Sequence, residues 1–253
     1  MKQAILSAKG LCKSFAHNGG QLHILSHIDF DLYEGDFTVI MGASGSGKST
    51  LLYALSGMDR ATAGEVHYRG KNLVTMKEKE LARLRCTDFG FIFQQMHLVS
   101  NLTLFENVAV SGYLNKQKSA AQVRTYTNEL LEQMSVSHIK THLPVQVSGG
   151  EQQRCAVARA VVNSPSVLFA DEPTGALNRR NTTEVLNLLT RLNQDGQSVL
   201  MVTHDLHAAL RASRLLYLED GKIIGELTLS PYHANEEKSR ETQVNAWLTS
   251  LKW

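Results

Sequence analysis

The chain has 253 residues, of which 43% are hydrophobic and 20% charged, and its 26 basic and 24 acidic residues leave a formal charge of only +2. No apolar run reaches the roughly 18–20 residues that a membrane-spanning helix needs, and no basic stripe indicates a nucleic-acid surface, so a membrane-spanning protein and a nucleic-acid-binding one are excluded. The N-terminus lacks the features of a secretory signal peptide, and the three widely spaced cysteines predict reduced thiols. We therefore expect a cytosolic globular protein, with one large domain or two closely associated ones.

Short apolar runs that alternate with helical patterns predict an α/β fold built on a mostly parallel sheet. The expected strands are 24–32, 37–41, 89–93, 167–170, 198–203 and 215–218, with a further strand-like stretch at 4–7. The expected helices are 50–55, 120–134 and 155–162, and Val185, Leu188, Leu189 and Leu192 have the i, i+3, i+4, i+7 spacing of a buried helix face. Between two strand-like runs, Asp220-Gly221 predicts a tight hairpin.

The texture of the chain changes over 98–153, where long polar-rich helical stretches predict a helical subdomain inserted into the α/β core. The core would then comprise 1–97 and 154–230, and 231–253 would form a C-terminal extension. In that extension Val244, Trp247, Leu248 and Leu251 predict a short amphipathic helix. Such a helix docks either on its own core or on a partner, and the pattern leaves both open.

The segment from Gly42 to Ser49 matches the phosphate-binding pattern GxxxxGK[ST], and it lies between an apolar strand and a helical run that includes Thr50. Glycines allow backbone N–H groups to curl around phosphate oxygens, and the helix N-terminus adds its positive dipole end. Lys48 is expected to reach the β- and γ-phosphates, and the Ser49 hydroxyl to bind Mg²⁺. The motif predicts that the chain binds a nucleotide.

Two further apolar strands end in residues suited to nucleotide chemistry. The strand 167–170 leads into Asp171 and Glu172, and a parallel sheet would place these carboxylates beside the phosphate loop. Asp171 suits the metal shell, and Glu172 could polarise the attacking water. The expected strand 198–203 leads into His204, which could hydrogen-bond the γ-phosphate or the water, or could be structural.

A second anion cradle is predicted at Ser148-Gly149-Gly150-Glu151, where two glycines precede a helix but no lysine follows. A simple kinase or GTPase has no use for a second cradle. The most direct explanation is that one cradle serves the chain's own nucleotide and the other serves the nucleotide of a second copy. The sequence therefore predicts head-to-tail dimerisation around ATP.

These motifs resemble those of the nucleotide-binding subunit of an ABC transporter, and the resemblance extends over about 5–227. The loop from Gly42 is similar to Walker A, 148–152 to the family signature, and 171–172 to Walker B with its catalytic glutamate. The resemblance implies a P-loop ATPase whose sheet is accompanied by an antiparallel β subdomain. Catalysis would be carried out by Glu172, His204 and Lys48.

The resemblance also implies a full set of ligand contacts. Gln94 falls at the Q-loop glutamine, which touches Mg²⁺, Phe15 falls where an aromatic residue stacks on adenine, and His204 falls on the switch histidine. The metal ligands would be Ser49, Gln94 and Asp171. ATP would be bound by Phe15, Gly42, Ser44, Gly45, Ser46, Gly47, Lys48, Ser49, Thr50, Gln94, Ser148, Gly149, Gly150 and Glu151.

One position departs from the family pattern. Asn178 stands where the D-loop usually ends in aspartate, so the carbonyl acceptor is kept and the negative charge is lost. This puts communication between two ATP sites in doubt, although Glu172 and His204 are present, and we expect active hydrolysis.

The segments 57–60, 90–94 and 170–177 are similar to the branch of the family that serves FtsX-type permeases, which includes lipoprotein-release, macrolide-export and antimicrobial-peptide transporters. Within it, 41–44 and 76–81 are most similar to bacitracin-type (Bce) peptide-resistance ATPases. The implied partners are a second copy of the chain and an integral membrane permease, with a sensor kinase reached through the permease left open and no nucleic acid.

In this reading the chain lies at the cytoplasmic face of the membrane, and Leu98, Val99 and Leu104 either line a groove for the permease or belong to the core. The alternatives are a lipoprotein-release or macrolide-export ATPase, a soluble ABC-type ATPase without a permease, and a metabolic kinase, which would not explain the second cradle.

Overall fold

The computed structural model describes residues 4–17 and 19–252 and divides the chain into two compact units. One unit combines Met1–Leu81 with Asn193–Trp253, and the other is Ala82–Leu192. Within the described ranges, no helix is both long enough and apolar enough to span a bilayer. The predicted subdomain 98–153 stays a prediction, although the stretch contains helices and no strand in the structure.

The first unit contains an antiparallel sheet of order β2-β1-β4-β5. Its strands are β1 (Ala4–His17), β2 (Gly20–Tyr33), β4 (Ala63–Tyr68) and β5 (Lys71–Asn72). In β1 and β2 the leucines at 6, 11, 25 and 32 are fully buried, so one face of this sheet builds core. The sheet confirms the antiparallel subdomain that the resemblance implied.

The same unit holds strands in the order β10-β9-β3-β8. These are β3 (Phe37–Met41), β8 (Ser198–Val202), β9 (Arg214–Glu219) and β10 (Lys222–Thr228). Strand β3 is parallel to β8 and to β9, and every residue of β3 and β8 is buried, as expected for parallel strands covered on both faces. The β9–β10 hairpin turns at Asp220 (φ 44°) and Gly221 (φ 72°), which confirms the predicted tight turn.

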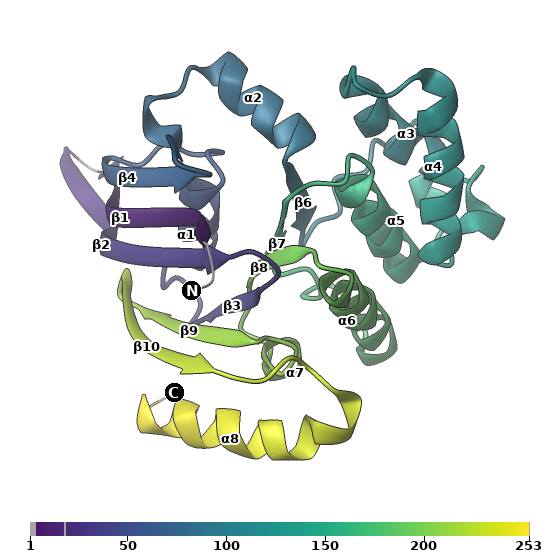
Figure 1. Ribbon diagram of the computed structural model, residues 1–253. Helices are drawn as coiled ribbons and strands as arrows, with labels where there is room; N and C mark the ends of the chain where they lie inside the picture. Colours follow the sequence, from purple (N-terminus) through teal and green to yellow (C-terminus); the bar gives the residue numbers. More distant parts are fainter. Residues whose placement is uncertain (1–3, 18, 253) are drawn as a thin grey trace. The chain divides into compact units, whose positions relative to one another are not determined.

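Helix α8 (Glu237–Ser250) runs along β10 (Figure 1). Its Val244 and Leu248 are buried, and the ring of Trp247 meets that of Tyr217 edge-on at 6.5 Å between centroids. The buried guanidinium of Arg240 donates hydrogen bonds to the backbone carbonyls of Leu210 (2.9 Å), Ser230 (2.8 Å) and Ala212. Of the two roles left open for this helix, the structure shows docking on its own unit.

The second unit pairs β6 (Phe89–Phe93) in parallel with β7 (Val167–Asp171), in a register that places Phe93 opposite Asp171. Helices α3 (Leu104–Leu114), α4 (Ala120–Gln133) and α5 (Gly149–Val161) pack against one another (Figure 1). Helix α6 (Arg179–Gln194) follows β7. The remaining helices are α1 (Lys48–Leu55) and α7 (Leu206–Ala209) in the first unit, and α2 (Glu78–Thr87), which has residues in both. These elements confirm the predicted α/β fold class.

Candidate functional site

The loop after β3 is shaped by glycines that no other residue could replace without strain. Gly42, Gly45 and Gly47 have φ angles of 155°, 82° and 101°, all in the region that favours glycine. A Cβ on Gly42 would lie 2.2 Å from the carbonyl oxygen of Leu218, and one on Gly47 would lie 3.1 Å from Leu25. A side chain at either position would meet its neighbours too closely, so both positions require glycine. Glycines of this kind let the backbone N–H groups of a loop surround a phosphate.

Polar groups converge on this loop. The buried Lys48 ammonium donates to the carbonyl oxygens of Gly42 (3.0 Å) and Ala43 (2.9 Å), and the hydroxyl of Ser46 is buried without a hydrogen-bond partner among the described residues. Helix α1 begins at Lys48 and has no acidic residue in its first turn, so its own sequence does not offset its positive end. A cationic side chain, an orphan hydroxyl and a helix N-terminus fit a polyphosphate.

The remaining loop residues differ in exposure. Ser44 and Gly45 are exposed, and Ser49 and Thr50 are half-buried in the first turn of α1. A hydroxyl such as that of Ser49 is the kind of oxygen ligand that Mg²⁺ accepts.

Two more predicted residues lie in the same unit as this loop. The amide N–H of Thr203 donates to the carbonyl of Ile40 (3.1 Å), so the ends of β8 and β3 meet at one sheet edge, with the exposed His204 next in the chain. Phe15 lies on β1 with 44% of its surface exposed, and the Lys13 ammonium lies 4.7 Å from its ring centroid. The structure thus places His204 just after the end of β8, beside the end of β3 where the loop begins, and leaves part of the Phe15 side chain exposed on β1.

The second unit gathers Gln94, Asp171 and Glu172. Because Phe93 pairs with Asp171, the residues that follow both strands, Gln94 and Glu172, emerge at the same edge. A Cβ on Gly175 would lie 2.9 Å from the Gln94 amide nitrogen, so the Gln94 side chain packs against the turn after Glu172. Glu172 itself has φ 45°, a left-handed conformation unusual for glutamate.

The oxygen ligands available here suit a magnesium ion that is shared with phosphate and water, and they do not make a complete metal site by themselves. Among the residues that the structure describes, no group of three His, Cys, Asp or Glu side chains could hold a metal alone. Magnesium is commonly held by one or two carboxylates together with phosphate and water oxygens. The buried Asp171 carboxylate and the Gln94 amide oxygen suit that role.

Gln153 supports this edge and was missed from sequence. It is fully buried in α5, and its side-chain amide donates to the carbonyl of Phe93 (3.1 Å) and to that of Pro173 (2.7 Å). Those carbonyls belong to the residues beside Gln94 and Glu172. Gln153 therefore ties the second cradle's helix to both strand ends.

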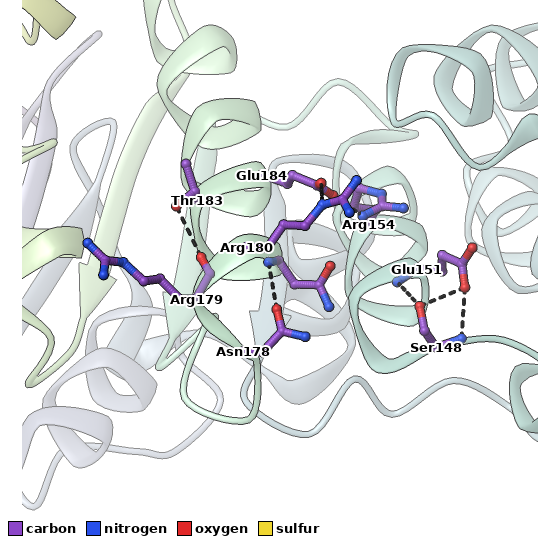
Figure 2. Close-up of polar contacts among 9 residues, drawn as sticks. Ser148, Glu151, Arg154, Asn178, Arg179, Arg180, Thr183 and Glu184 are labelled. Carbon is purple, nitrogen blue, oxygen red and sulfur yellow. Dashed lines mark hydrogen bonds and ion pairs between the residues drawn. The ribbon is translucent and has the colours of Figure 1, made fainter.

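The second cradle is a capped helix N-terminus. Ser148 caps α5 by accepting from the Glu151 amide (3.4 Å), and the Glu151 carboxylate accepts from the Ser148 amide (2.8 Å) and hydroxyl (2.6 Å), as Figure 2 shows. These bonds lower the pKa of Glu151. A Cβ on Gly150 would lie 2.3 Å from the Asn181 side chain, so α5 and α6 approach closely at this glycine. Helix α5 begins at Gly149, six residues earlier than expected.

Asn178, the residue that departs from the family pattern, caps α6. Its side-chain oxygen accepts from the backbone amide of Asn181 (3.0 Å) (Figure 2). Its backbone carbonyl accepts from the amide of Thr182 (2.9 Å). The amide thus performs the capping for which an aspartate would also serve. The roles assigned to individual site residues from sequence stay predictions.

Comparison with known proteins places these features in a family. Residues 25–175, more than half of the chain, match the ABC transporter family. The chain is 37% identical over all of its 253 residues to the macrolide export ATP-binding/permease protein MacB of Pasteurella multocida (strain Pm70), of which it spans 38%. The chain is thus much shorter than this relative.

Solved structures give the same result. The dimeric bacterial ABC transporter cassette MJ0796 is 35% identical, covers 90% of this chain and 100% of its own, and superposes with a TM-score of 0.84. Its post-hydrolysis state bound to ADP and Pi gives 0.83 over the same coverage. The structure of cbiO1 from Clostridium perfringens, part of the transporter complex cbiONQ, is 25% identical with a TM-score of 0.79 over 95% of this chain and 92% of its own. The chain belongs to the ABC transporter family and is an ABC-type ATPase domain.

Proposed function

We propose that the chain is the ATP-hydrolysing subunit of an exporter, which dimerises around two Mg·ATP and drives an FtsX-type permease. The observation that carries the proposal is the alignment of the whole chain with MacB, whose name combines an ATP-binding part with a permease. The permease would be a separate chain or a further part of the same polypeptide. In either case the ATPase would be held at the cytoplasmic face of the membrane.

In the proposed dimer, each ATP lies between two copies of the chain. Lys48 and Ser49 of one copy would bind the phosphates and Mg²⁺, and Ser148 and Gly150 of the other would complete the site. Two helix N-termini that follow glycine-containing motifs, that of α1 without a side-chain cap and that of α5 capped by Ser148, support this arrangement because a helix N-terminus favours an anion. The similarity to a dimeric cassette supports it as well.

A groove in the second unit is our candidate for the permease contact. It has a volume of about 240 Å³ and is lined by Phe91, Phe93, His97 and Leu114, among others. Leu114 is 67% exposed. Of the three residues considered from sequence, Leu104 is fully buried and belongs to the core, whereas Val99 is 49% exposed and Leu98 is half-buried.

The cargo we propose is an amphiphilic antimicrobial compound. Similarity to MacB favours the macrolide-export group, whereas the resemblance of 41–44 and 76–81 to bacitracin-type ATPases favours a peptide. A sensor kinase reached through the permease would be a partner only in the peptide case.

The test uses Glu172→Gln, which removes the proposed general base while keeping the shape of the side chain. Loss of a general base typically costs about 10²–10⁴-fold in turnover, so we expect ATP binding and ATP-dependent dimerisation without hydrolysis. Glu132→Gln, an exposed carboxylate on α4, is the matched control and should hydrolyse ATP normally. Wild-type turnover no higher than that of Glu172→Gln would contradict active hydrolysis.

Affinity purification of Glu172→Gln from native membranes with ATP then identifies the partner. A four-span permease supports macrolide export or lipoprotein release, and a ten-span permease with a large external domain supports peptide resistance. If no membrane protein is recovered, the transport proposal fails and the soluble ATPase takes its place.

A further inference from the structure

A second pocket in the second unit is lined by none of the residues assigned to the nucleotide site. It has a volume of about 390 Å³ and lies among the C-terminal end of α4, α5 and one face of α6. Its polar lining includes Gln133, Ser135, Arg154, Arg180, Glu184 and Arg191. The floor is partly apolar, because Met134 and Leu188 also line it.

The charge of this pocket is positive. Three arginines and one glutamate leave a net charge of +2 among its lining residues. The Glu184 carboxylate already accepts from the Arg154 guanidinium (2.6 Å) and from Nε of Arg180 (3.2 Å), as Figure 2 shows. The pocket's own carboxylate is therefore engaged, and the remaining arginine donors face no counter-ion in the lining.

Two of the lining arginines, Arg154 and Arg191, differ in their burial and in their contacts. Only 12% of the Arg154 side chain is exposed, and its buried Nε has no hydrogen-bond partner among the described residues. Because almost none of its surface is accessible, Nε itself does not face the pocket, and Arg154 can offer an anion there only the other nitrogens of its guanidinium. Arg191 lies two helical turns after Glu184 on the same face of α6, about 10 Å along the axis, and makes no ion pair with another described residue.

We propose that this pocket binds the phosphate group of a small molecule, held between Arg154 and Arg191 with Arg180 at the rim. A phosphate offers several acceptor oxygens and matches the planar fork of arginine, so it can bond two guanidinium groups at once. The apolar floor reduces competition from water. Arg154 lies on α5, three residues after Glu151, and its guanidinium also pairs with Glu184 of α6. An anion bound to Arg154 would therefore contact the same helix that Ser148 caps.

The test follows the Arg Nε–H signals of the full-length chain by NMR, with Mg·ADP present to occupy the phosphate loop. Inorganic phosphate is titrated at constant ionic strength, because screening would otherwise imitate weak binding. We expect a saturable shift of the Arg154 signal. Arg191→Gln, an exposed position, should raise the dissociation constant about tenfold or more, as expected when a charge-assisted hydrogen bond is lost.

The matched control is Arg124→Gln, an exposed arginine on α4 that removes the same charge outside the pocket and should bind phosphate like the wild type. Phosphoserine separates the two sources of the phosphate group: tighter binding than inorganic phosphate indicates a monoester, and equal binding indicates the free ion. Equal weakening by both variants, no saturable shift of the Arg154 signal, or a shift with a hexaglutamate peptide but not with phosphate would each overturn the proposal.

Discussion

Replacing Gln153 by methionine keeps the volume of a fully buried side chain and removes its two hydrogen bonds, to the carbonyls of Phe93 and Pro173. Each bond contributes roughly 1 kcal/mol, and a buried carbonyl left without its donor adds about 1–3 kcal/mol. Removal of the Gln153 side-chain oxygen, which is buried and unpartnered, recovers part of this cost. We expect a net loss of about 3 kcal/mol in the free energy of unfolding.

For a chain of this size, such a loss lowers the melting temperature by about 6–12 °C. Urea unfolding followed by circular dichroism measures the free energy directly. ATP turnover should also fall, by about tenfold or more, because the two carbonyls adjoin Gln94 and Glu172 and small displacements at a reacting centre are costly.

Gln152→Met is the matched control. Gln152 also donates two hydrogen bonds to carbonyls, of Pro144 (3.0 Å) and Val147 (3.3 Å), but its side chain is half-buried, so water can replace them. We expect it to lose no more than about 1 kcal/mol. Equal destabilisation by the two substitutions, or normal turnover in Gln153→Met, would refute the reasoning.

Three further expectations follow from the structure. Asn178→Asp keeps the cap of α6 and adds a negative charge at the helix N-terminus, so it should raise the free energy of unfolding by about 0.3–1 kcal/mol, and a lower melting temperature would contradict this. Arg240→Met leaves three carbonyls without their donor and should cost about 3 kcal/mol or more, with faster proteolysis within α8; unchanged protease resistance would show that Arg240 does not hold the helix. Burial raises the pKa of Cys155 to about 12, so its thiol should react with a disulfide reagent at pH 8 only after unfolding. Because the unfolded thiol ionises near its ordinary pKa of 9.0 and the folded one does not, the free energy of unfolding should also fall as the pH rises above about 9; labelling of Cys155 in the native state would contradict both statements.

The parts of the fold predicted from sequence are those in which a local pattern determines the structure. Strands β3 and β8 are continuous apolar runs, and the Asp220-Gly221 turn needs two left-handed residues that this dipeptide supplies. Strand β1 was largely missed beyond its first residues. Its pairing with β2 shifts register several times between Ala4 and Ser14, and each irregularity breaks the period-two alternation by which a strand is recognised.

The site shows the same division. Motif residues such as Lys48 are found because consecutive residues build the phosphate loop. The true start of α5 could have been found from the sequence, because Ser148 followed three residues later by Glu151 is the pattern of a capping box. The two glycines between them obscured this signal. Gln153 gave no local signal at all, because its two acceptors lie 60 and 20 residues away in the chain.

The left-handed backbone at Glu172 implies conformational strain at the proposed catalytic carboxylate. A glutamate with φ 45° would relax to an ordinary conformation if nothing restrained it, a difference of about 1–3 kcal/mol. Its restraints include the hydrogen bonds from the Gly175 amide to the Glu172 carbonyl (3.0 Å) and from the Gln153 side chain to the Pro173 carbonyl. Weakening those bonds would let the Glu172 backbone relax and displace the carboxylate while the sheet stays intact. Hydrolysis would then be lost under conditions in which the protein is still folded.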